Sequence, residues 1–80
     1  MIQVKQFLDL HDDDISSVCV SRLDEGYAVN VALTGDRGNH RICTQKNEIR
    51  YFKTVDAFIA LLFRRDRPER VNVVFYDIIG

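Results

Sequence analysis

The apolar residues between residues 54 and 66 recur at a helical spacing, which predicts an amphipathic helix. Four apolar residues recur there at i, i+3, i+4 and i+7: Val55, Phe58, Ile59 and Leu62. This spacing places them on one face of a helix. We therefore expect the helix to pack on a sheet. Leu61 and Phe63 widen the apolar face, and the alternative is that this extra width is a surface for a partner.

The residues at both ends support the helix. Thr54 is suited to the N-cap, because its hydroxyl can accept a hydrogen bond from a free amide of the first turn. Arg64 and Arg65 lie at the carboxyl end, where positive charge is favoured. Pro68 follows in a loop, and residues 70–76 are rich in β-branched and aromatic side chains, which predicts a final strand.

The rest of the chain alternates shorter apolar stretches with turn residues. The pattern predicts a short helix over residues 2–10, strands over 15–23, 27–33, 40–45 and 49–52, and turns at 24–26, 34–39 and 46–48. Short turns between successive strands imply antiparallel pairing. We therefore predict an α+β fold: a mainly antiparallel sheet, with a three- to four-strand meander and a C-terminal strand, one long helix on one face and a short N-terminal helix.

Length and composition point to one soluble domain covering residues 1–80. The chain is 46% hydrophobic and 29% charged, as in globular proteins, and its net charge is −1. It has no apolar run near the ~18 residues of a membrane span and no pattern of a secretory signal, so we expect no membrane association. Cys19 and Cys43 are too few for a disulfide scaffold, which favours reduced thiols and a cytoplasmic location.

Two groups of residues are candidates for a metal or nucleophile site. The run from His11 through Asp14 offers hard ligands, but it lacks the spacing of a calcium loop, so a solvated loop is favoured. His40 and Cys43 would point to opposite faces of a strand and could not converge there. Cys19 lies between two valines, which suggests a packed thiol. We therefore expect no metal and no catalytic cysteine.

Motifs for phosphate, dinucleotide or hydrolase chemistry are absent from the sequence. The two glycines at positions 35 and 38 are typical of a turn rather than a phosphate cradle, since no helix follows them. The sequence therefore predicts a protein that is not an enzyme and needs no cofactor, with an enzyme of unrecognised site as the weakest alternative.

Arg64, Arg65, Arg67 and Arg70 form the densest group of basic residues and are the candidate surface for a partner or for nucleic acid. Asp66 and Glu69 interrupt the group, and such exposed ion pairs contribute only ~0–1 kcal/mol each. A solvated helix end is therefore the favoured interpretation of this group, with a partner or nucleic-acid surface as the functional alternative. Residues 1–36 also carry an excess of acids and residues 37–80 an excess of bases, a polarity that can accompany a partner surface.

Three stretches carry a resemblance to a known family. They are the run IRYFKTVDA at residues 49–57, Leu61 with Leu62, and VNV at 71–73. Together with Gly26 in a hairpin, they resemble the small partition-associated accessory proteins of plasmids and integrative elements. The resemblance implies a hairpin, an aromatic entry to a helix and a last strand, but no catalytic or binding residues. The chain departs from the family pattern at residues 67–69, where RPE stands in place of a glycine.

These observations lead to two main functional hypotheses. The first is a non-catalytic accessory binding protein, with a protein partner or a second copy held at a sheet edge or on the wide helix face. The alternative is a small nucleic-acid-binding regulator that uses the four arginines. A deep polar pocket would instead favour the enzyme.

Overall fold

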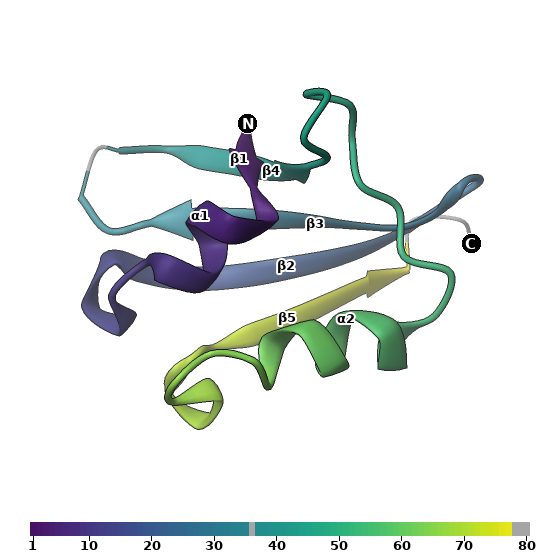
Figure 1. The fold of residues 1–80 in the computed structure, drawn as a ribbon. Coiled ribbons are helices and arrows are strands. Elements are labelled where there is room, and N and C mark those ends of the chain that lie inside the picture. The colour runs from purple at the N-terminus through teal and green to yellow at the C-terminus, as the bar shows by residue number, and fades with distance from the viewer. Residues whose placement is uncertain (36, 78–80) are drawn as a thin grey trace.

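A five-stranded mixed sheet is the framework of the protein, seen in the computed structural model that describes residues 1–35 and 37–77 (Figure 1). Its strands are β1 (Ile2–Gln3), β2 (Ile15–Leu23), β3 (Gly26–Leu33), β4 (Asn39–Cys43) and β5 (Val73–Asp77). They lie side by side in the order β1-β4-β3-β2-β5. The α+β class predicted from the sequence is confirmed. Residue 36, in the turn expected at 34–39, lies outside the described part.

The β2–β3 hairpin at the centre of the sheet follows the predicted alternation. Val18 lies opposite Val31 and Val20 opposite Val29, so these four buried valines share one face of the sheet. The intervening residues, such as Ser17 and Asn30, turn to the other face and remain half-buried. One face of the hairpin is thus the floor of the core and the other is largely polar or small.

Gly26 closes this hairpin in a conformation that other residues rarely adopt. Its φ is +135°, a value that glycine adopts without the steric penalty of a side chain. A Cβ atom there would also lie 2.8 Å from the carbonyl oxygen of Phe52, which approaches because Phe52 and Tyr27 exchange two backbone hydrogen bonds of 2.8 Å. The glycine therefore lets the segment before the second helix lie against β3.

Replacing Gly26 by alanine should lower the free energy of unfolding by about 1–3 kcal/mol, because strained backbone and a steric clash add up. Gly35→Ala is the matched control: its φ is +70°, but nothing lies within 4 Å of the added Cβ. Urea denaturation of both variants measures the difference. Equal losses for the two substitutions would mean that the Phe52 carbonyl does not matter.

The prediction of a mainly antiparallel sheet is wrong. β3 pairs antiparallel with β2 and β4, but β1 pairs parallel with β4 and β5 parallel with β2, so β3 alone runs against the other strands. The cause of the second parallel pair is the connection through the helix, which carries the chain back across the sheet before β5 begins. Parallel neighbours require such a crossover.

The predicted strand at residues 49–52 is also absent. The structure has only two isolated bridges there, between Ile49 and Cys43 and between Phe52 and Tyr27. This segment crosses from the end of β4 to the start of the helix and meets two different strands, so it cannot form a continuous ladder with either. It runs as an irregular extended segment, and Phe52 turns its ring into the core.

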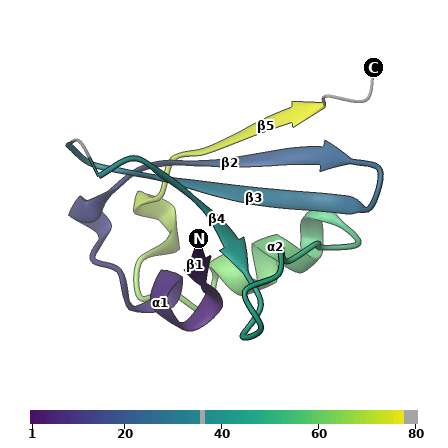
Figure 2. The ribbon, with the colours of Figure 1, turned by 90° about the horizontal axis from the view of Figure 1, so that it is seen from above.

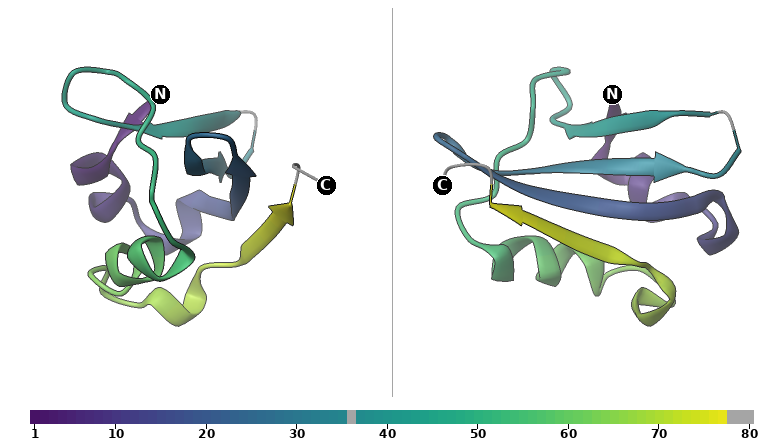
Figure 3. Two further views of the ribbon diagram at one scale, coloured as in Figure 1. Left: turned by 90° about the vertical axis from the view of Figure 1, so that its right-hand side faces the viewer. Right: turned by 180° about the vertical axis from the view of Figure 1, so that it is seen from behind.

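Two helices cover the same face of the sheet (Figures 2 and 3): α1 (Val4–Asp9) and α2 (Val55–Leu62). α1 is shorter than the predicted 2–10, because Ile2–Gln3 pairs with β4 and the Gln3 amide donates to Gln6 Oε1 at 2.8 Å. Short 3₁₀ helices, η1 (Asp12–Asp14) and η2 (Pro68–Arg70), follow α1 and α2. The described residues contain no helix with the length and hydropathy of a membrane span.

The N-cap predicted for α2 is confirmed, since Thr54 Oγ1 accepts from the Ala57 amide at 3.1 Å. The helix ends at Leu62 rather than residue 66. Its last turn tightens, with the amides of Arg64 and Arg65 donating to the carbonyls three residues earlier at 3.0 Å. The tightening changes the direction in which the following side chains point.

The core lies between the helices and the β2–β3–β4 face. Phe58 of α2 is fully buried at its centre, with the Phe52 ring 5.6 Å away edge-on and the Phe7 ring 6.4 Å away. Aromatic rings at these separations attract one another beyond the gain from burial. The apolar stripe predicted from the sequence thus forms the anchor of the fold.

Candidate functional site

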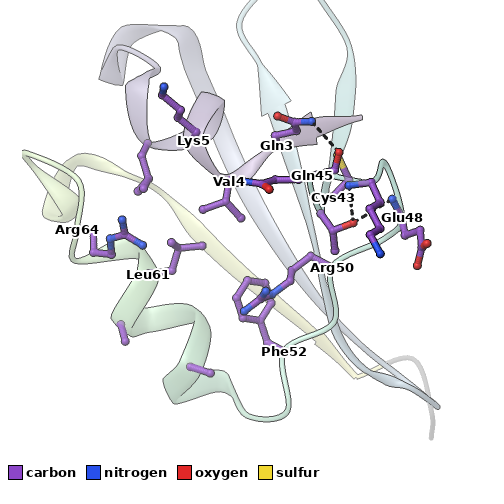
Figure 4. A pocket seen from close by; sticks show the side chains of 15 residues that line it. Gln3, Val4, Lys5, Cys43, Gln45, Glu48, Arg50, Phe52, Leu61 and Arg64 are labelled. Carbon is purple, nitrogen blue, oxygen red and sulfur yellow. Dashed lines mark hydrogen bonds between the residues drawn. The ribbon is translucent and has the colours of Figure 1, made fainter.

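A groove of about 1100 Å³ lies between α1, α2 and the segment that follows β4 (Figure 4). Each of its walls comes from a different part of the chain. α1 and the residue before it provide one wall, α2 provides the second, and residues 43–52 provide the third. The groove exists because both helices cover the same sheet face without closing on each other.

The floor of the groove is apolar. Val4 and Leu8 of α1 are half-buried there, and Leu61 of α2 and Phe52 are buried beneath them. These side chains also pack against the hydrophobic core, so their positions are fixed by the fold. A partner with apolar side chains would find a preformed surface here.

The loop wall is held by its own hydrogen bonds. Thr44 Oγ1 accepts from the amides of Lys46 and Glu48 at 3.2 and 3.3 Å, and the Thr44 amide donates to the Glu48 carbonyl at 2.7 Å. Gln3 Nε2 donates to the Gln45 carbonyl at 3.5 Å, which ties the wall to the start of α1 (Figure 4). The third wall is thus an ordered turn.

Positive charge surrounds the apolar floor. Four exposed cations line the groove, namely Lys5, Lys46, Arg50 and Arg64, and among the described lining residues the only acid is Glu48. None of the four forms an ion pair with a residue of the described part of the chain. The Arg50 guanidinium lies over the Phe52 ring, 5.2 Å from its centre, which holds it at the edge of the floor.

The described residues that line the groove include one cysteine and no histidine. Cys43 is buried, and no histidine of the described chain lines the groove, so no imidazole is placed to activate the thiol. Within residues 1–35 and 37–77, no three of His, Cys, Asp and Glu gather as metal ligands. What the arrangement can do is bind, through apolar contact on the floor and through charge at the rim.

The four arginines of the predicted cluster are not brought together on one surface. Arg64 lines the groove, whereas Arg65, Arg67 and Arg70 line a second hollow of about 540 Å³. Four acids share that second hollow: Asp9, Asp12, Asp13 and Asp66. Arg67 and Arg70 therefore lie in mixed charge rather than in a continuous basic face.

Arg65 is an internal residue, only 5% exposed. Its guanidinium donates to the carbonyl oxygens of Phe7 and Leu10, the latter at 2.7 Å, and pairs with Asp12 Oδ1 at 3.0 Å. It also lies over the Phe7 ring, 5.2 Å from its centre. Arg65 thus fastens the end of α1 to the end of α2 and is not available to an external partner.

The other sequence candidates are separated in space. His11 accepts a hydrogen bond from the Asp13 amide at 3.2 Å and precedes η1, so the expected loop at 11–14 contains a 3₁₀ turn. His40 Nε2 lies 2.9 Å from the Arg37 carbonyl oxygen, and Cys43 is buried at the other end of β4. Cys19, expected to be packed, is half-buried.

Three cations of the groove were missed by the sequence interpretation. Lys5, Lys46 and Arg50 lie in different segments that only the fold brings together, so no local pattern could indicate them.

Comparison with family models, with curated proteins and with solved structures finds no match for the chain.

Proposed function

We propose that the protein is a non-catalytic binding module whose groove receives an acidic, amphipathic segment of a protein partner. One observation carries the proposal: an apolar floor ringed by four cations that have no ion pair among the described residues. An amphipathic helix binds a groove through apolar side chains on one face, while charges at the rim steer it and select against wrong partners.

The size of the groove supports a polypeptide rather than a small molecule. Its volume of about 1100 Å³ lies above the upper end of the ~300–1,000 Å³ typical of small-molecule pockets. Its polar side chains come from α1, from the segment after β4 and from the end of α2, so they are spread around the rim instead of converging on one point (Figure 4). Such a surface is better filled by several side chains of one helix.

The resemblance to partition-associated accessory proteins is compatible with this role. In that case the partner would be another protein of the plasmid or integrative element. The support for this accessory role is the three sequence stretches together with Gly26.

Nucleic acid is the less favoured occupant. Arg65 is internal, and Arg67 and Arg70 share their hollow with acids, which repel phosphates. Single-stranded nucleic acid also needs exposed aromatic faces for stacking, whereas Phe52, the one aromatic ring among the described lining residues, is buried.

The test is a titration of the labelled protein with a designed amphipathic peptide of about 14 residues, apolar at helical spacing and flanked by Asp and Glu. We expect chemical-shift changes at Val4, Leu8 and Leu61, and a dissociation constant that weakens at least about tenfold when Arg64 is changed to Glu. A peptide of the same apolar pattern with Lys in place of the acids should bind far more weakly.

Lys53→Glu is the matched control, because Lys53 is exposed and adjacent to the same segment but does not line the groove. It should change affinity less than about twofold. If both peptides bind equally, or if labelled single-stranded or duplex DNA binds in an Arg64-dependent manner while the acidic peptide does not, the proposal is wrong.

A further inference from the structure

The two edges of the sheet differ in their readiness to accept another strand. β1 forms one edge and has only two residues before α1 begins. β5 forms the other edge with five residues, and no strand in the described part of the chain pairs with its outer side (Figures 1 and 3). Unpaired backbone groups on a strand of this length are a template for pairing.

The register identifies which groups face outward. The Val18 amide donates to the Asn72 carbonyl at 2.7 Å, and Val18 lies beside Val73. In a parallel pair the backbone groups of alternate residues point to the neighbour, so those of Val74 face β2. The amide and carbonyl groups of Val73 and Phe75 therefore point away from the sheet, toward an edge that no described strand occupies.

Large apolar side chains accompany these free groups. Phe75 and Tyr76 are each 53% exposed. Phe75 lies on the valine face of the sheet, since it is in register with Val20, and Tyr76 lies on the opposite face beside Ser21. The strand has no lysine, proline or bulge, which are usual devices that protect an edge, and its one charged residue, Asp77, stands at its end.

We infer that β5 pairs antiparallel with β5 of a second copy, about a two-fold axis at Phe75. The outward groups of Phe75 and of its counterpart then exchange two hydrogen bonds across the axis. Val73 lies opposite Asp77, and Val74 lies opposite Tyr76, on both sides. The two sheets join into one continuous sheet, and both exposed aromatic residues gain cross-strand partners.

A second copy suits this edge because the register is self-complementary. No residue of β5 meets a like charge: the valines and aromatics lie opposite one another, and position 77 lies opposite Val73. Isologous contacts of this kind close on themselves, which prevents extension into a filament. A filament would require a second long free edge, and β1 is too short to provide one.

The area involved predicts a weak, reversible dimer. A buried aromatic side chain covers ~150–250 Å², so two that are 53% exposed leave roughly 200 Å² for the contact. Stable complexes bury about 800 Å² per partner. The association should therefore depend on concentration in the micromolar to millimolar range. It is independent of the groove, which β5 does not line.

The test is sedimentation equilibrium of the full chain between ~10 μM and ~1 mM. The wild type should shift from monomer to dimer. Phe75→Glu and Phe75→Lys should each be monomeric throughout, because each places like charges opposite one another at the two-fold axis. Circular dichroism establishes that both variants are folded, as expected for a half-exposed site.

The decisive sample is an equimolar mixture of the two variants. It should associate again, because the glutamate introduced in one chain would face the lysine introduced in the other. Ile49→Glu, at an exposed apolar residue beside β4, is the control and should dimerise like the wild type. A wild type that stays monomeric, a dimer that survives Phe75→Glu, or a mixture that stays monomeric would each overturn the inference.

Discussion

Replacing Phe58 with alanine is expected to lower the free energy of unfolding by about 3–5 kcal/mol, a large share of the stability of a domain of this size. Phe58 is fully buried and contacts the rings of both Phe7 and Phe52, so it joins α1, α2 and the segment before α2. Truncation removes its own apolar surface and leaves a cavity that three rigid elements cannot collapse into.

The measurement is the midpoint and slope of chemical denaturation. Phe63→Ala is the matched control, since it removes the same side chain from a position 67% exposed at the end of the same helix. That variant should change stability by less than about 0.5 kcal/mol. A small effect of Phe58→Ala would show that the sheet face is stable without the helix.

Arg65→Met is expected to destabilise the protein by about 3 kcal/mol, although the substitution keeps most of the side-chain volume. The guanidinium donates to the carbonyls of Phe7 and Leu10 and pairs with Asp12, whose side chain is itself only 19% exposed. Methionine leaves these acceptors without donors in a site that water reaches poorly.

Arg64→Met is the matched control. It makes the same substitution at the neighbouring arginine, which is exposed, so it shows whether the loss of stability depends on the buried position of Arg65. It should change stability by less than about 0.5 kcal/mol. A double-mutant cycle with Asp12→Asn should show coupling to Arg65, with Asp12→Asn costing much less in the Arg65→Met background. Additive effects of the two changes would contradict a shared role.

Most local structure was accessible from the sequence because it depends on neighbours in the chain. The β2–β3 hairpin follows from strict alternation around Gly26, and the start of α2 follows from Thr54. The end of α2 was predicted too late, because residues 63–66 have good helical character. They tighten into a turn instead, and Arg65 then reaches the end of α1.

The pairing partners and directions of the strands could not be predicted from the sequence. The β-branched and aromatic residues at 70–76 predict a strand but contain no information on its direction. Only the crossover through α2 makes the observed strand, β5, parallel to β2. The short turn around residues 46–48 suggested a further meander strand, whereas two isolated bridges were formed.

The candidate site depends on the fold in the same way. Arg64 to Arg70 looked like one basic group because they are close in sequence. The turn after α2 instead places Arg64 at the groove, buries Arg65, and leaves Arg67 and Arg70 in a hollow of mixed charge. One signal was available: position 65 continues the stripe of Phe58 and Leu62 by helical spacing, and an arginine there indicates an internal charge.

The parallel pairing of β2 with β5 has a consequence for how the chain acquires its structure. The pair joins Val18 to Val73, and Arg65 bonds the Leu10 carbonyl. Both contacts therefore connect residues that are far apart in the sequence. Closing such loops costs entropy before any contact compensates for it. During synthesis, the β2–β3 hairpin can therefore form early. The side of β2 that pairs with β5 stays open until residues 73–77 have left the ribosome.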